Sequence, residues 1–229
     1  MRAVQIIAKK RSIVTGSSRT DAGVHSQGLT ANFHLPYTIE PQSLKKALNA
    51  LLPDDIRISE CQVADRSFNA RFGAKRKTYL YRVYRGQVQS PFECRFVTHM
   101  PYPLDLHAMR RSLKHFLGRQ DFSSFTSDDP QKNKFREIDE FRMKVHGDHI
   151  DFTVKGRSFL RYMVRNMVGT VLDIGRGRIQ PDDVPGIFAA RDRRKAGQTA
   201  PAKGLTLWSV EYEEVPAGAL PEEEGSDYE

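Results

Sequence analysis

The chain has 229 residues, of which 39% are hydrophobic, and this length can bury a substantial core in one domain or in two smaller ones. We predict two lobes of similar size. No apolar run approaches the roughly 20 residues that cross a bilayer, and the N-terminus lacks the apolar stretch and cleavage site of a secretory signal. Membrane association and secretion are therefore not expected, and the two cysteines, Cys61 and Cys94, fit a reducing cytoplasm because they form neither a disulfide framework nor a metal pattern.

The charge balance differs between the body of the chain and its C-terminus. The net charge of +8 includes six carboxylates and no Lys or Arg within residues 214–229, which leaves +14 on the residues before them. A body this basic predicts a polyanionic partner; an inert basic surface is the alternative. Residues 214–229 are predicted to be a disordered acidic tail.

The first elements lead into a glycine-containing loop. Residues 2–10 predict a short helix or a strand, and residues 11–15 predict a brief strand before the loop. In that loop Arg19 and Asp21 stand two apart among small residues, which indicates a tight turn that holds a carboxylate against a guanidinium. A plain turn with a local ion pair is the alternative.

Three further elements are predicted before residue 62, and together they indicate a compact α/β lobe. Alternating apolar and polar residues predict a strand over 29–35, apolar positions at helical spacing predict a helix over 41–52, and a second strand is predicted over 56–61.

Residues 66–85 combine aromatic and basic side chains. Tyr79, Tyr81 and Val83 would share one face of a strand. Aromatic planes beside cations such as Lys75 and Arg76 are what a nucleic-acid groove needs. A tyrosine-rich sheet with a solvated basic face is the alternative. The first lobe is predicted to end at residue 98, within a connecting stretch over 91–103.

The second lobe is predicted over residues 99–213, and its elements are a helix over 105–117, strands over 138–145 and 150–155, a long helix over 158–175, a short helix over 181–190 and a last strand over 205–212. Which face of the last strand points inward is left open, although the set Trp208, Val210 and Tyr212 is the more apolar. Arg161 and Arg165 lie one turn apart beside the apolar stripe of the long helix, and an arginine in such a place usually extends to solvent.

Residues 19–25, RTDAGVH, resemble the catalytic motif of the TruA-type tRNA pseudouridine synthases. Further matches to that family follow in the same order and extend from about Gly16 to Tyr212, namely ARF-x-A-xxxx-Y-x-Y, DFSSF, MVRNMVG and AP-x-x-GL. The resemblance implies an α+β pseudouridine synthase fold, with two similar lobes of antiparallel sheets and flanking helices around a central basic cleft. It also implies a homodimer that binds tRNA, without a cofactor, and isomerises uridines 38, 39 and 40 of the anticodon stem-loop.

The resemblance assigns roles to four residues. Asp21 would attack or deprotonate the target uridine, which must leave the base stack. Arg19 would assist that displacement, Tyr79 would pack on the extruded base, and Arg165 would pair with Asp21 and keep it ionised. Tyr79 is also a candidate for proton transfer at C5.

The family opens with a strand and a helix that this chain lacks, since only 18 residues precede Arg19. We therefore expect exposed sheet edges and apolar surface in the first lobe, and Ser18 stands where the family usually has glycine. Two other functions stay open: a non-catalytic RNA-binding paralogue of the same fold, and a metal-dependent hydrolase that uses Asp21 and His25. For His25 we favour a structural hydrogen bond over a metal.

Overall fold

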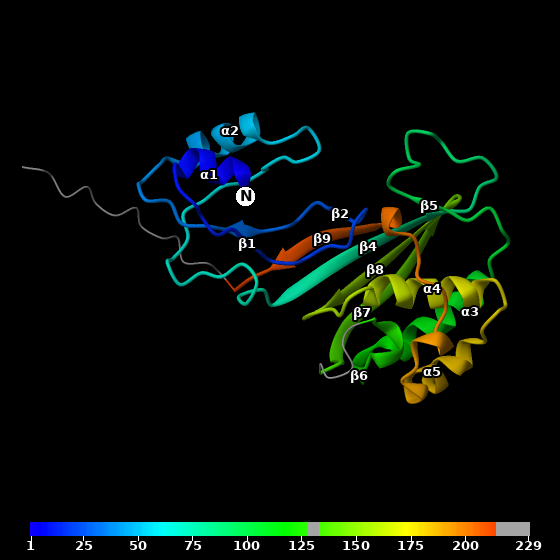
Figure 1. Ribbon diagram of the computed structural model, residues 1–229. Coiled ribbons are helices and arrows are strands. Elements are labelled where there is room, and N and C mark those ends of the chain that lie inside the picture. The colour runs from blue at the N-terminus through cyan, green and yellow to red at the C-terminus, as the bar shows by residue number, and fades with distance from the viewer. Residues whose placement is uncertain (128–132, 214–229) are drawn as a thin grey trace, which may run out of the picture. The chain divides into compact units, whose positions relative to one another are not determined.

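The structure is a computed structural model that describes residues 1–127 and 133–213 (Figure 1). It divides into two compact units. The smaller unit contains residues 1–17 and 30–73 together with the described residues from Tyr212 on, and the larger contains residues 18–29 and 74–211. The tail predicted for residues 214–229 lies outside the described residues.

The smaller unit packs two helices over a short two-stranded sheet. Helix α1 (Arg2–Ala8) and helix α2 (Pro41–Leu51) bury small and aliphatic side chains against one another, and β1 (Thr15–Gly16) pairs antiparallel with β3 (Ala31–Asn32). The predicted helix over 41–52 is confirmed. It begins after Glu40, whose carboxylate accepts hydrogen bonds from two first-turn N–H groups at 2.9 and 2.6 Å.

Several sequence predictions change in this unit. Residues 2–10 take the helical alternative, and the strands predicted over 11–15 and 29–35 shrink to the two-residue pair β1–β3. The strand predicted over 56–61 is wrong. The Asn49 side chain, in helix α2, accepts a hydrogen bond from Ile58 N at 2.7 Å and donates one to Ile58 O at 3.0 Å. A helix side chain therefore pairs with the backbone of this segment in place of a partner strand. Some apolar side chains of this unit lie at its surface, such as Ile13, which is 80% exposed.

The larger unit is built on a mainly antiparallel sheet of seven strands. The strands are β2 (His25–Ser26), β4 (Arg76–Tyr84), β5 (Thr98–His99), β6 (Gly118–Asp121), β7 (Phe135–His146), β8 (His149–Gly156) and β9 (Leu205–Glu211). Their order is β2-β9-β4-β8-β7-β6, with β5 beside the end of β4. Among the described strands only β2–β9 and β4–β5 pair in parallel.

The long hairpin and the tyrosine strand are confirmed. Gly147, at φ +58°, turns β7 into β8. In β4, the side chains of Tyr79, Tyr81 and Val83 point into the core and are 7%, 0% and 0% exposed.

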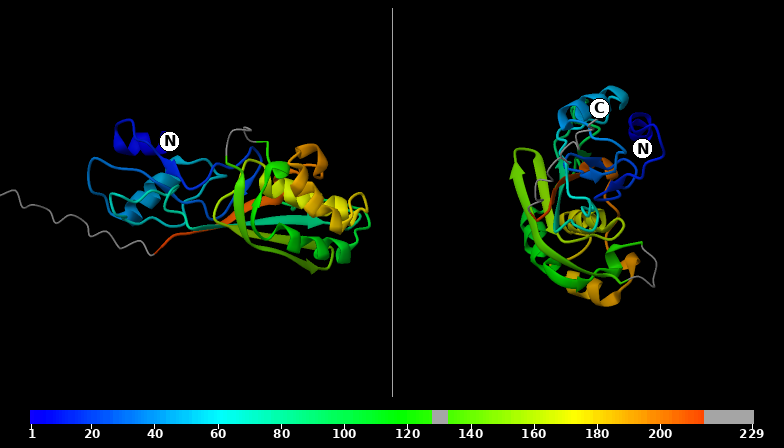
Figure 2. Two further views of the ribbon diagram at one scale, coloured as in Figure 1. Left: turned by 90° about the horizontal axis from the view of Figure 1, so that it is seen from below. Right: turned by 90° about the vertical axis from the view of Figure 1, so that its left-hand side faces the viewer.

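Helices cover one face of this sheet (Figures 1 and 2). They are α3 (Leu106–Ser112), α4 (Met163–Gly175) and α5 (Val184–Ala190), with short 3₁₀ turns η1 (Leu113–Phe116), η2 (Ser123–Phe125), η3 (Pro181–Asp183), η4 (Arg193–Lys195) and η5 (Ala202–Gly204). Twelve of the thirteen residues of α4 are buried, which makes it the central helix of the unit. It begins at Met163, later than predicted, because Tyr162 adopts the left-handed conformation at φ +61° and ends the preceding turn.

The structure shows which face of the last strand points inward, and it places the unit boundary elsewhere than predicted. In β9 the buried side chains are Leu205 and Leu207, while Trp208 is 40% exposed. The boundary predicted at residue 98 falls inside the larger unit, because β4 pairs with β8 and β9 on the far side of it. No described helix has the length and hydropathy of a membrane span.

Candidate active site

The loop that carries Asp21 is held in the larger unit by the last strand of the sheet. His25 pairs with Thr206 in parallel, and the N–H of Gln27 donates to Leu207 O at 2.9 Å. Gly28 then passes so close to β9 that a Cβ there would lie 2.4 Å from the Trp208 carbonyl oxygen, so this position requires glycine. These contacts fix the Asp21 loop onto the sheet.

Asp21 and Arg165, 144 residues apart, meet in an ion pair. Arg165 Nη1 lies 3.2 Å from Asp21 Oδ2, and the two side chains are 15% and 23% exposed. The partner of Asp21 is thus the helix arginine and not Arg19, so the alternative of a local ion pair within the turn is wrong. Arg165 does not extend freely to solvent, since its Nε also donates to the Ala200 carbonyl at 2.8 Å.

Tyr79 lies beside this pair in the same unit. Its hydroxyl is 3.3 Å from Ser18 Oγ, and its ring meets that of Phe159 edge-on, with centroids 5.0 Å apart. Burial raises the pKa of Tyr79, the hydrogen bond with Ser18 opposes that rise, and the charge of Asp21 adds to it. The phenol is therefore protonated at neutral pH and can donate a hydrogen bond.

Arg19 is exposed, and no described residue holds its guanidinium. Among the four predicted site residues, the structure joins Asp21 and Arg165 in direct contact and places Tyr79 near enough to feel the charge of Asp21. An exposed arginine two residues from Asp21 is free to meet a ligand that enters the loop.

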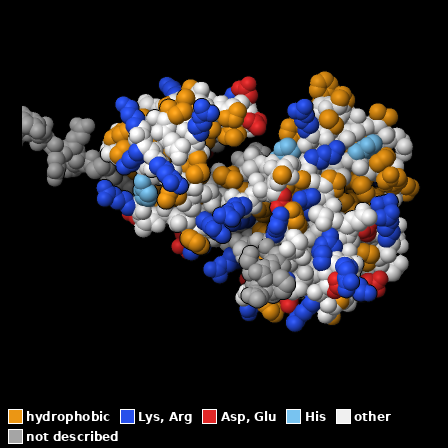
Figure 3. Space-filling view, viewed as in Figure 1, with side chains coloured by type: hydrophobic (Ala, Val, Ile, Leu, Met, Phe, Trp, Pro, Cys, Tyr) orange, Lys and Arg blue, Asp and Glu red, His pale blue; other side chains and the backbone are white. Residues whose placement is uncertain are grey.

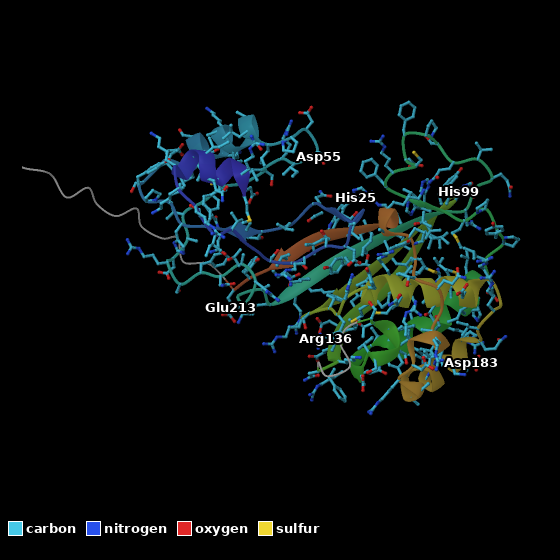
Figure 4. All side chains as sticks on the ribbon, in the orientation of Figure 1. His25, Asp55, His99, Arg136, Asp183 and Glu213 are labelled. Atoms are coloured by element: carbon cyan, nitrogen blue, oxygen red, sulfur yellow. The ribbon has the colours of Figure 1, made fainter. Side chains whose placement is uncertain are left out.

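His25 has a structural role. Its Nε2 lies 2.8 Å from the Arg95 carbonyl oxygen, and its ring centroid is 4.8 Å from that of Phe96. Figure 4 labels His25 in β2, beside β9. Because a carbonyl only accepts, Nε2 carries the proton. Among the described residues no group of three or more His, Cys, Asp or Glu side chains could hold a metal ion, so nothing in that part of the chain supports the hydrolase alternative.

Two aromatic side chains lie at the site without having been predicted from the sequence. Tyr162 lies with its ring 5.2 Å from the Arg165 guanidinium carbon and 4.7 Å from that of Arg161, within the range of cation–π attraction. Phe159 borders Tyr79. Both precede the MVRNMVG motif in the sequence. The helix predicted over 158–175 would have included them, whereas helix α4 begins only at Met163.

Basic side chains are spread over the face of each unit that Figure 3 shows, with carboxylates between them. Near the Asp21 loop, Lys203 Nζ donates to the Cys94 carbonyl at 2.9 Å, and Arg19 is exposed. Exposed cations beside a carboxylate site suit a polyanionic ligand.

The site has the makeup of a catalytic centre based on a carboxylate, in which an aspartate serves as nucleophile or base and an arginine orients it. Comparison with known proteins gives the family. Residues 113–213 match the family model described as tRNA pseudouridine synthase. The tRNA pseudouridine synthase A of Geobacillus sp. (strain WCH70) is 44% identical over 214 residues, which is 93% of this chain and 86% of that protein. The protein of the same name from Bacillus subtilis (strain 168) is 41% identical over 207 residues, 90% of this chain and 84% of the relative. The chain belongs to the tRNA pseudouridine synthase family, whose members are isomerases.

Proposed function

We propose that this chain isomerises uridine to pseudouridine in tRNA, with Asp21 as the catalytic carboxylate. The observation that carries the proposal is the Asp21–Arg165 ion pair beside the buried Tyr79. The reaction breaks the bond from uracil N1 to ribose C1′, turns the base, and joins C1′ to C5; the hydrogen on C5 leaves as a proton, and N1 takes up a proton. Electrons balance without an oxidant or reductant, so these side chains suffice for the chemistry.

Each site residue has a distinct task in this scheme. Asp21 acts as nucleophile or as base, and Arg165 orients its carboxylate. Tyr79 contacts the extruded uracil, and its protonated phenol can take part in proton transfer at C5. Arg19, exposed and close to Asp21, helps displace the target nucleotide from its stack.

The partners and targets follow from the family resemblance. We propose tRNA as substrate, uridines 38, 39 and 40 of the anticodon stem-loop as targets, and a homodimer as the working form. A basic cleft between two lobes belongs to the same proposal. The free thiols of Cys61 and Cys94 fit the predicted cytoplasmic location.

Release of tritium from tRNA labelled at uracil C5 tests the activity. We expect release by the wild-type protein, none by Asp21→Asn, which keeps the shape of the side chain, and full release by the matched control Asp148→Asn in the exposed β7–β8 turn. If folded wild-type protein binds tRNA without releasing tritium, the RNA-binding paralogue is the correct alternative. If Asp21→Asn still releases tritium, Asp21 is not the catalytic carboxylate.

A second measurement tests the substrate class. The basic surface predicts that log Kd for tRNA rises linearly with log salt concentration, because each contacted phosphate releases counterions. A flat salt dependence would contradict electrostatic binding of RNA.

A further inference from the structure

Two hydrogen bonds hold the Arg165 side chain, and only one of them is made to Asp21. A single hydrogen bond between Nη1 and a carboxylate leaves a long arginine side chain able to rotate. The second contact, from Nε to the Ala200 carbonyl at 2.8 Å, removes that freedom, and the backbone N–H of Ala200 returns a bond to Arg165 O at 3.1 Å. The position of Ala200 therefore helps to fix where the guanidinium lies.

The residues next to Arg165 and Ala200 are joined as well. Thr199 Oγ1 donates to Asn166 Oδ1 at 2.7 Å, and Arg193 Nη2 lies 2.9 Å from both of these oxygens. Asn166 is only 1% exposed, and its Nδ2 donates to the Phe125 carbonyl at 2.8 Å. This fully bonded amide fixes the loop residue 199, and with it residue 200, on helix α4. We call Asn166, Arg193 and Thr199 the loop clamp.

Arg193 is an unusual choice for a purely structural contact. Its side-chain hydrogen bonds go to neutral oxygens: Asn166 Oδ1, Thr199 Oγ1 and, at 3.3 Å, the Ala196 carbonyl. Among the described residues no carboxylate pairs with it, and burial lowers its pKa. Partial burial of a guanidinium without a counterion is costly, and against that cost Arg193 Nη2 bonds to Asn166 Oδ1 and Thr199 Oγ1 together.

We propose that Asn166, Arg193 and Thr199 are positioning residues, which act through the Ala200 carbonyl to hold the Arg165 guanidinium against Asp21. The inference deepens the proposed isomerase function and rests on it. The loop clamp does not touch Asp21 and reaches Arg165 only through residue 200. Loss of a clamp hydrogen bond therefore lowers the rate of the chemical step and leaves the affinity for tRNA unchanged.

The loop has other attachments that keep a clamp variant folded. Gly197 N donates to Thr170 Oγ1 at 2.9 Å, and Gln198 N donates to Asp173 Oδ2 at 3.1 Å. Loss of the Thr199 hydroxyl leaves both in place. Thr170→Val is the matched control, because it removes a hydroxyl at the same helix–loop contact but not one that bonds to Asn166 Oδ1.

Single-turnover tritium release tests the proposal in the full-length protein. We expect Thr199→Val, which keeps the side-chain shape, to slow release about tenfold, because it removes the two hydrogen bonds that the Thr199 hydroxyl makes in the clamp; the Kd for tRNA should not change. Thr199→Ser, which keeps the hydroxyl, should release tritium at the wild-type rate. Thr170→Val should lower the free energy of unfolding without changing the rate of tritium release. In an Arg165→Lys background Thr199→Val should add no further loss, because a lysine has no Nε–H donor for Ala200. Equal losses in Thr199→Val and Thr199→Ser, or a full further loss in the lysine background, would overturn the proposal.

An NMR measurement separates this proposal from the proposed function, because it needs no turnover. The Nε–H signal of Arg165, assigned by its absence in Arg165→Lys, should exchange slowly with water in the wild-type protein. We expect faster exchange in Thr199→Val and wild-type exchange in Thr199→Ser and Thr170→Val. Unchanged exchange in Thr199→Val contradicts the clamp whether or not the protein is an isomerase.

Discussion

Gly169 lies where helix α4 contacts the loop over residues 196–200. Its replacement by alanine should destabilise the protein and lower the rate of tritium release. A Cβ at this position would lie 1.7 Å from Gln198 O and 3.1 Å from Ala200 N. Both are backbone atoms, so no rotamer change relieves the contact, and the loop must move by more than an ångström.

The size of the effect follows from opposing contributions. Alanine is favoured over glycine in a helix by about 1 kcal/mol. Overpacking costs about 1–3 kcal/mol, and movement of the loop weakens three hydrogen bonds, from Gly197, Gln198 and Ala200 to the helix, each of which contributes about 0.5–1.5 kcal/mol. We therefore expect Gly169→Ala to lower the free energy of unfolding by about 2–4 kcal/mol.

Gly186 in α5 provides the matched control. A Cβ there meets nothing within 4 Å, and the residue is exposed, so Gly186→Ala should stabilise the protein by about 0.5–1 kcal/mol. Urea unfolding of the two variants, with single-turnover tritium release, measures both consequences. A Gly169→Ala protein that is as stable and as fast as the wild type would refute the role given to this close approach.

Three further predictions concern single hydroxyl or carboxyl groups. Tyr81→Phe should destabilise the protein by about 1–2 kcal/mol in urea unfolding, because it leaves Thr98 Oγ1 and a backbone carbonyl without the buried phenol 2.6 and 2.9 Å away; Thr98→Val added to it should cost little more. Burial raises the pKa of Tyr79, so the stabilising effect of the protonated phenol is complete below about pH 10 and is lost as the pH rises further. Tyr79→Phe should therefore reduce the fall in melting temperature above about pH 10. A fall as steep as in the wild type would contradict this. Hydrogen bonds from the Arg194 side chain and backbone lower the pKa of Asp192 to about 2, so the stabilising effect of this carboxylate is present above about pH 4 and is lost as the pH falls towards 2. The wild type and Asp192→Asn should therefore differ in melting temperature at neutral pH and converge in acid. A difference that stays constant with pH would argue against the lowered pKa.

The elements that sequence patterns predicted well are those with a long, regular apolar repeat. Helix α2, the β7–β8 hairpin and strand β4 each show a clear period, and each is present. Residues 56–61 show a similar alternation but form no strand, because the bonds that Asn49 makes to Ile58 depend on tertiary position. Strand β2 has only two residues, so it carries no period that could be detected.

The residues of the candidate site were predictable only in part, and from a family motif instead of an apolar repeat. The apolar stripe of α4 by itself favoured an arginine extended to solvent, and only the resemblance to a known motif connected Arg165 with Asp21. The contact of Arg165 with Ala200 had no sequence signal, since any residue supplies a backbone carbonyl. The left-handed backbone at Tyr162 was equally hidden, because tyrosine rarely adopts it and the helical pattern runs through it.

The parallel pairing of β2 with β9 also affects how the protein is made. His25 leaves the ribosome 181 residues ahead of its partner Thr206. Contacts this distant in sequence form late in folding. During synthesis the nascent chain therefore carries Asp21 without the strand that fixes its loop, and the candidate site is completed only after β9 has been translated.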